Sequence, residues 1–253
     1  MAASRPRVAY VIFDMDGLLI DTESVYTLVT NRILEPYGVE MTWDIKAELM
    51  GMPERAASER LLSHFPGIAL TVDDYITQRR ALQDTLWPSA LPLPGAHRLL
   101  THLHQHRIPI AVATGSQYRN YLLKTSHLPE MFGLFGGRVV CGDDVRLGGR
   151  GKPHPAGFLL AGSELGFPVG EGEEGEANGV TEEEKRMRAQ GLVFEDAKSG
   201  VLAGKRAGMN VVWVPDERLR ALDPENTYGA DQIIQSLEEF KPQEWGLPPY
   251  ADP

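Results

Sequence analysis

The chain has 253 residues, of which 42% are hydrophobic and 24% charged, an ordinary composition for a globular protein with one large core or two modest domains. Its formal net charge of −10 argues against a nucleic-acid-binding surface. The single cysteine, Cys141, excludes an internal disulfide framework and fits a reducing compartment. The sequence has neither a signal-peptide core nor an apolar run of membrane-spanning length, so we expect a cytoplasmic protein.

The first predicted element is a buried parallel strand over residues 8–13, which are apolar throughout. The strand runs into two carboxylates, Asp14 and Asp16, which extended geometry would point the same way. Because two ionised carboxylates this close repel each other, we expect a positive partner, such as a divalent cation bound through oxygen. Gly17 then allows a tight turn and a close backbone approach to a ligand.

A helical region follows this turn. Thr22 can cap a helix whose apolar residues recur at helical spacing, and Gly38 ends that pattern. Further helices are predicted over residues 43–50, 56–65 and 71–86, the last with a capping-box-like start at Thr71. We therefore predict that residues 22–92 form an all-helical domain inserted after the first strand.

The remainder of the chain alternates between helix and strand. Strands are predicted over residues 108–113, 138–141, 192–194, 211–214 and 231–234, separated by helices over 96–105, 118–125, 154–165 and up to Ala207. This alternation predicts an α/β fold: a Rossmann-like parallel sheet core with helices on both faces, built from residues 1–21 and 93–253.

One segment, residues 170–190, interrupts this alternation. It is rich in glycine and glutamate and poor in large apolar side chains, so we predict a solvated loop insertion. Residues 171–184 carry seven glutamates and no lysine or arginine; without these glutamates the net charge would be −3. The acidity of the chain is thus concentrated in one segment and says little about its ligand.

Three later segments add polar groups at predicted strand ends or helix starts. Thr114-Gly115-Ser116 follows a strand and opens a helix, which suits phosphate binding, although an ordinary helix cap has the same composition. Lys152, between Gly151 and Pro153, can balance the carboxylates and stabilise a phosphoryl group, or can be a solvated surface lysine.

The third segment, Glu195-Asp196, ends a strand with adjacent acids. Only one of two neighbouring residues easily faces Asp14 and Asp16, while the other can reach a metal through water. Oxygen ligands of this kind suit Mg²⁺. The alternative is a plain acidic start to the next helix.

Asp-x-Asp, Thr-Gly-Ser, Gly-Lys-Pro and Glu-Asp occur here in the order of the haloacid-dehalogenase-like phosphatases, which the chain resembles over its whole length. Within that superfamily it resembles most the pseudouridine-5'-phosphatase-like group, in residues 12–23, 49–51, 193–197, 207–209 and 236–248.

The resemblance implies that Asp14 is the nucleophile and Asp16 a general acid/base. It also implies that Lys152, Thr114, Gly115 and Ser116 hold the phosphoryl oxygens. Asp14, Asp16 through its backbone carbonyl, and Asp196, helped by Glu195, would hold Mg²⁺. Residues 22–92 would be the cap, in which Glu23 and Arg55 are candidate substrate-binding residues. Met52 stands where relatives often carry a basic residue.

The function that we predict is Mg²⁺-dependent hydrolysis of a small phosphorylated metabolite through an aspartyl-phosphate intermediate. Pseudouridine 5'-phosphate and sugar phosphates are candidate substrates. One alternative is a phosphoglucomutase-like phosphoryl transferase, and another is a non-catalytic binding protein that uses the acidic insertion. We expect a monomer with neither a nucleic-acid nor a membrane partner.

Overall fold

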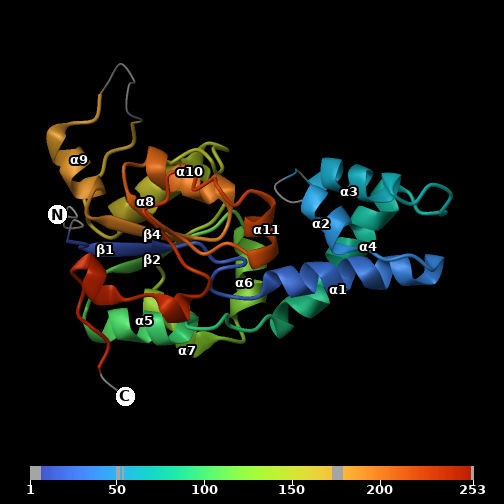
Figure 1. Cartoon of the computed structure of the whole chain (residues 1–253), viewed down its shortest axis with the longest axis horizontal. Helices are drawn as coiled ribbons and strands as arrows, with labels where there is room; N and C mark the ends of the chain where they lie inside the picture. Colours follow the sequence, from blue (N-terminus) through green and yellow to red (C-terminus); the bar gives the residue numbers. More distant parts are fainter. Residues whose placement is uncertain (1–6, 50–51, 53, 173–178, 252–253) are drawn as a thin grey trace. The chain divides into compact units, whose positions relative to one another are not determined.

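The computed structural model describes residues 7–49, 52, 54–172 and 179–251. The chain divides into two compact units, Met1–Ile20 with Pro92–Pro253, and Asp21–Leu91 (Figure 1). The boundaries predicted from the sequence differ from these by one residue each. None of the helices in the described part is both long and apolar enough to cross a membrane.

The first unit is built on a parallel sheet, as predicted. Within the described residues the sheet has six strands in the order β3-β2-β1-β4-β5-β6. Their bounds are Tyr10–Phe13 (β1), Ile110–Ala113 (β2), Val139–Val140 (β3), Gly191–Glu195 (β4), Asn210–Trp213 (β5) and Gln232–Ile233 (β6). The strand order reverses direction between β1 and β4, and open α/β sheets bind their ligands beyond the carboxyl ends of the strands at such a point.

Helices cover both faces of this sheet, which confirms the predicted fold class. In Figure 1, α8 and α10 lie on one face and α5 and α7 on the other. The helices of this unit are α5 (Ala96–Gln105), α6 (Tyr118–Thr125), α7 (Pro129–Phe132), α8 (Ala156–Glu164), α9 (Glu182–Arg188), α10 (Lys198–Arg206) and α11 (Glu217–Leu222).

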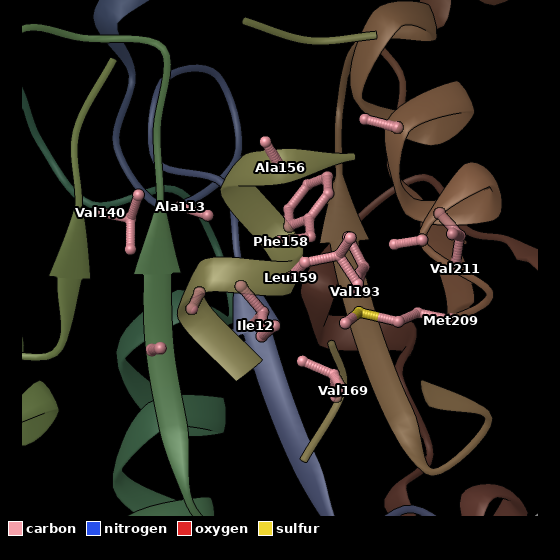
Figure 2. Close-up of a cluster of buried hydrophobic side chains, with 14 of the residues drawn as sticks. Ile12, Ala113, Val140, Ala156, Phe158, Leu159, Val169, Val193, Met209 and Val211 are labelled. Atoms are coloured by element: carbon pink, nitrogen blue, oxygen red, sulfur yellow. The ribbon is translucent and has the colours of Figure 1, made fainter. Parts of the chain in front are cut away.

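The core of this unit fixes the central strands from both sides, because side chains alternate along each strand. On one face, Ile12 and Val193 join a buried cluster with Phe158 of α8 (Figure 2). On the other face, Phe13 stacks on Phe194 with ring centroids 5.0 Å apart. All four residues of β1 are buried, and the first ionisable carboxylate after this strand is Asp14.

The second unit is helical, with α1 (Thr22–Leu34), α2 (Trp43–Leu49), α3 (Glu54–Ser63) and α4 (Val72–Leu86). Helix α1 packs on α4, and a buried hydrogen bond of 3.0 Å joins Thr30 to Tyr75. Thr71 caps α4, as its sequence pattern predicts, by accepting a hydrogen bond from the Asp74 amide. The prediction that Thr22 caps α1 is wrong: the Asp21 carboxylate accepts from the Ser24 amide, and Thr22 is buried in the first turn.

The prediction of a loop throughout residues 170–190 is also wrong in part, because Glu182–Arg188 form α9. Thr181 and Glu184 make a reciprocal capping box at its start. Glutamates occupy its first turn and basic residues its last, which favours a helix through the helix dipole. Residues 173–178 of the predicted insertion lie outside the described residues.

Candidate active site

The sheet register brings the predicted motifs to one edge. Phe13 lies opposite Val112 of β2 and Phe194 of β4, so Asp14, Ala113 and Glu195 come next on three adjacent strands. The Asp14 amide also donates a 3.0 Å hydrogen bond to the Phe194 carbonyl. The hydrogen bonds of the sheet therefore set the positions of these groups, and loop conformation contributes little.

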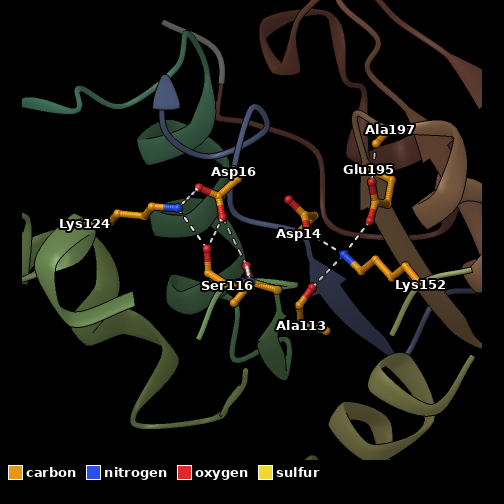
Figure 3. Close-up of polar contacts among 9 residues, drawn as sticks. Asp14, Asp16, Ala113, Ser116, Lys124, Lys152, Glu195 and Ala197 are labelled. Carbon is orange, nitrogen blue, oxygen red and sulfur yellow. Dashed lines mark hydrogen bonds and ion pairs between the residues drawn. The ribbon is translucent and has the colours of Figure 1, made fainter. Parts of the chain in front are cut away.

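Lys152 joins all three of these strands. Its ammonium contacts Asp14 Oδ1, lies 2.6 Å from Glu195 Oε1, and donates a 2.9 Å hydrogen bond to the Ala113 carbonyl (Figure 3). Its side chain is 16% exposed, and those of Asp14 and Glu195 are 9% and 1% exposed. Lys152 is therefore a nearly buried cation shared by two carboxylates, and not a solvated surface lysine.

Both carboxylate oxygens of Glu195 accept hydrogen bonds from protein donors. Oε1 accepts from Lys152, and Oε2 accepts from the Ala197 amide at 3.1 Å. Gly200 of α10 makes room for this arrangement, since a Cβ there would lie 1.7 Å from Glu195 Oε1. The structure thus places Glu195, which the sequence suggested as a metal ligand, beside Lys152 as an anchor for its ammonium.

Electrostatics at this edge favour a proton on the nucleophile candidate. Burial raises the pKa of Asp14 to about 7; Lys152 opposes that rise, and the carboxylates of Glu195 and Asp16 add to it. Burial alone would lower the pKa of Lys152, but Asp14 and Glu195 outweigh it and raise the pKa above its ordinary value. Acidic groups at this edge are therefore incompletely neutralised by Lys152.

Asp16 belongs to a separate group of contacts. Its Oδ2 accepts from the Ser116 hydroxyl at 2.8 Å and from the Thr114 hydroxyl at 3.3 Å. Its Oδ1 lies 2.6 Å from the ammonium of Lys124, a residue that sequence reasoning missed. The only signal in the sequence is periodic: Lys124 shares the buried face of α6 with Tyr121 and Thr125, where a charged side chain is unexpected.

The glycines predicted to approach a ligand have defined roles in the backbone. Gly17 has a φ of 77°, and its amide donates to the Ile20 carbonyl at 3.0 Å within the turn after β1. A Cβ on Gly115 would meet open space, whereas one on Gly142 would lie 2.3 Å from the Gly115 carbonyl oxygen. Gly142, which the sequence did not single out, therefore allows the Thr114–Ser116 loop to lie close to the end of β3. The Ser116 amide itself donates to the Thr114 hydroxyl at 3.0 Å.

The acidic groups at this edge repel one another, and a divalent cation would neutralise them. Four acidic residues, Asp14, Asp16, Glu195 and Asp196, follow or end β1 and β4, against the two lysines already described. Burial is the main cause of the raised pKa of Asp14, and the neighbouring carboxylates of Glu195 and Asp16 raise it further. Among the described residues no cluster of three or more histidine, cysteine, aspartate or glutamate side chains has metal-binding geometry. A cation here would need backbone carbonyl and water ligands in addition to carboxylates, as Mg²⁺ commonly does.

The candidate substrate-binding residues of the helical unit have partners of their own. Glu23 of α1 lies 3.0 Å from the Lys46 ammonium. Arg55 of α3 pairs with Asp73 on the surface, where their side chains are 61% and 78% exposed. Met52 is 39% exposed. Met50 and Gly51, which contribute to the family resemblance, lie outside the described residues.

Comparisons with known proteins identify the family of this chain. The family model described as haloacid dehalogenase-like hydrolase matches residues 11–214. The chain is 44% identical to (DL)-glycerol-3-phosphatase 2 of Arabidopsis thaliana, across 100% of this chain and 97% of that protein. It is 38% identical to the probable pseudouridine-5'-phosphatase of Drosophila melanogaster, across 97% of each.

A solved structure shares the fold. The crystal structure of a HAD family hydrolase from Deinococcus radiodurans R1, with bound phosphate and sodium, matches 98% of this chain and 100% of that chain with a TM-score of 0.73 at 21% identity. The family match spans most of the chain, and the two relatives, both named phosphatases, align over nearly their whole length. The chain therefore belongs to the haloacid dehalogenase-like hydrolases, and it is a phosphatase.

Proposed function

We propose that this phosphatase hydrolyses a small phosphorylated metabolite through an aspartyl-phosphate formed on Asp14. The observation that carries the proposal is the position of Asp14 at the strand-order reversal, buried and in contact with the Lys152 ammonium. A carboxylate held there by the hydrogen bonds of the sheet is ordered for attack on phosphorus. The adjacent lysine offers positive charge to the phosphoryl oxygens.

In the first step an Asp14 carboxylate oxygen bonds to phosphorus while the bond from phosphorus to the ester oxygen breaks. The departing oxygen takes a proton from Asp16, which becomes a carboxylate. Lys152, the Thr114 hydroxyl and the Gly115 and Ser116 amides hold the phosphoryl oxygens during this transfer. Most of the rate enhancement then comes from position and charge, because a phosphoryl group needs little other help from the protein.

In the second step water attacks the phosphorus of the aspartyl-phosphate and gives its proton to the Asp16 carboxylate. The bond from phosphorus to the Asp14 oxygen breaks, which releases phosphate and returns both aspartates to their starting forms. Asp16 therefore needs to be the acid in one step and the base in the next. Asp14 needs to be the nucleophile and then the leaving group.

Asp14, the Asp16 backbone carbonyl and Asp196 are the residues that would hold Mg²⁺. When bound, this ion supplies the positive charge that the surplus of carboxylates lacks and polarises a phosphoryl oxygen. Glu195, whose oxygens are both taken by protein donors, contributes indirectly by orienting Lys152.

The helical unit, residues 21–91, would act as the cap that excludes bulk water and selects the leaving group. Glu23, Met52 and Arg55 are its candidate substrate-reading residues. The relatives named for glycerol 3-phosphate and pseudouridine 5'-phosphate suggest a phosphorylated polyol or nucleoside as the substrate. Measuring kcat/KM with Mg²⁺ for a panel of such phosphomonoesters and of sugar phosphates identifies the preferred substrate.

Asp14→Asn tests the proposal. We expect it to abolish phosphate release and the acid-stable, hydroxylamine-sensitive phosphoenzyme that wild type forms, while the variant stays folded. Asp223→Asn is the matched control, because Asp223 accepts its hydrogen bond from Tyr228 on the exposed surface of the same unit. Phosphate release that persists in Asp14→Asn at the wild-type rate contradicts the assignment of the nucleophile.

A further inference from the structure

Lys124 is a buried charge of the core unit that the sequence motifs do not predict. Its side chain is 1% exposed, and it sits in the last turn of α6, outside all four sequence motifs. Its ammonium lies 2.6 Å from Asp16 Oδ1 and 2.9 Å from the Ser116 hydroxyl oxygen. Ser116 in turn donates to Asp16 Oδ2 at 2.8 Å. Lys124, Ser116 and Asp16 thus form a closed triangle of contacts.

This triangle fixes the orientation of one carboxylate. A carboxylate that accepts from a separate donor at each oxygen cannot rotate about its last bond without breaking one of the contacts. Ser116 lies in the loop after β2 and Lys124 lies on α6, so the two donors come from different elements. The Ser116 and Thr114 hydroxyls both contact Oδ2 and leave Oδ1 unconstrained, whereas the charged contact from Lys124 fixes Oδ1 as well.

The second lysine serves a different carboxylate. Figure 3 shows Lys152 directed at Asp14 and Glu195, and Lys124 directed at Asp16. The two aspartates are separated by a single residue, yet each has its own ammonium contact. Burial of an ammonium costs free energy unless a carboxylate compensates it, and for Lys124 that carboxylate is Asp16.

We propose that Lys124 is the positioning residue of Asp16: it holds the Asp16 carboxylate in the orientation required for proton transfer to and from the substrate. The inference rests on the proposed roles of Asp14 and Asp16. Lys124 keeps its own proton throughout. An ammonium at Oδ1 orients the carboxylate form of Asp16, which arises after Asp16 has given its proton to the leaving oxygen and which then accepts a proton from water.

A lysine that positions Asp16 affects the rate differently for different leaving groups, whereas a lysine that only anchors α6 does not. An alkyl phosphate needs a proton on its leaving oxygen, whereas p-nitrophenolate leaves without one. The kcat/KM value reports the steps up to release of the leaving group, so it excludes the later attack of water. Loss of Lys124 should therefore lower kcat/KM for an alkyl ester and spare p-nitrophenyl phosphate.

The experiment compares Lys124→Met with wild type on p-nitrophenyl phosphate and on the alkyl phosphomonoester that wild type turns over fastest, beginning with glycerol 3-phosphate. We expect kcat/KM to fall about 10- to 100-fold for the alkyl ester and less than about 3-fold for p-nitrophenyl phosphate. Equal falls on both esters overturn the proposal. Lys205→Met is the matched control, since it removes a lysine paired with Asp231 at 2.7 Å in the same unit. The ratio of its kcat/KM values on the two esters should equal the wild-type ratio.

Two further variants separate this inference from the proposed function. Asp16→Asn should show the same selective loss for the alkyl ester, and adding Lys124→Met to it should cause no further selective loss, because Lys124 acts through Asp16. Asp16→Asn without selectivity overturns the role of Asp16 and the inference with it. Selectivity in Asp16→Asn alone overturns only the role of Lys124. If Lys124→Met does not fold, Lys124→Arg applies the same comparison, since it keeps the charge but alters the contact geometry.

Discussion

The catalytic edge of the core unit and the surface of the helical unit differ in how deeply their ion pairs are buried. In the core unit the principal ion pairs, Lys152 with Asp14 and Glu195 and Lys124 with Asp16, have lysine side chains that are 16% and 1% exposed. The helical unit has a partly buried pair, Lys46 with Glu23, whose side chains are 13% and 39% exposed, and surface pairs such as Arg60 with Glu48, whose side chains are 50% and 41% exposed. Since water screens the surface pairs and not the buried ones, similar contact distances correspond to very different energies.

The largest contrast is expected from removing one cation in each unit. Lys152→Met leaves two buried carboxylates without their shared ammonium, so we expect a loss of about 3–5 kcal/mol in the free energy of unfolding. We also expect a fall of about 10²–10³-fold in kcat with Mg²⁺ present. Arg60→Met, its counterpart, should change stability by less than about 0.5 kcal/mol. Urea denaturation measures the free energy of unfolding, and steady-state kinetics measure kcat. Equal effects in the two variants would remove the distinction between the buried and the exposed ion pairs.

A steric change sharpens the same contrast without altering charge. Gly200→Ala places a Cβ where Glu195 Oε1 lies, which displaces the anchor of Lys152. We expect about a 10- to 100-fold loss of kcat/KM and a destabilisation of about 1–3 kcal/mol. Gly157→Ala on α8, where a Cβ meets nothing within 4 Å, should keep full activity and gain up to about 1 kcal/mol. Unchanged activity in Gly200→Ala would show that Glu195 has room to move.

Acidity gives a third test. Since the folded pKa of Asp14, about 7, exceeds its ordinary value of 3.8, the folded chain binds the extra proton between these values, and this part of its stability is lost as pH rises through 7. In metal-free buffer Asp14→Asn should therefore be more stable than wild type at pH 8 by on the order of 1–3 kcal/mol, and by less at pH 5. Mg²⁺ should narrow the gap by stabilising wild type. Thermal denaturation across pH, with and without chelator, measures this difference in stability between Asp14→Asn and wild type. A difference that does not change with pH contradicts the argument that burial raises the pKa of Asp14.

The smallest effect is expected on the helical surface. Arg55→Ala removes the exposed pair with Asp73 and should cost less than about 0.5 kcal/mol. If Arg55 binds the substrate, KM of the Arg55→Ala variant should rise several-fold while its free energy of unfolding stays unchanged. Arg80→Ala, which removes another surface contact, to Glu54, is the matched control. Parallel rises of KM in both variants would point to a general electrostatic effect.

Local patterns in the chain predicted most of the fold. Apolar runs located the central strands β1, β2, β4 and β5, because residues buried on both faces leave a continuous apolar signal. The two-residue edge strands β3 and β6 also lie within predicted strands. The short helices α7 and α11 escaped prediction, since fewer than two turns give little periodicity. Helix α9 was missed because its glutamates suggested a solvated loop, although Thr181 and Glu184 spell a capping box.

The catalytic edge divides in the same way. The sequence alone predicted that Asp14, Asp16, Thr114 and Glu195 would lie beyond the strand ends, because parallel strands bring their carboxyl ends to one edge. The sequence left open whether Lys152 lies at this edge, and the family resemblance implied that it does. Only the tertiary structure decided which lysine serves which carboxylate. Lys152 reaches Asp14 across 138 positions of sequence, and Lys124 reaches Asp16 across 108. Such pairings depend on how strands and helices pack, and local sequence spacing carries no record of that packing.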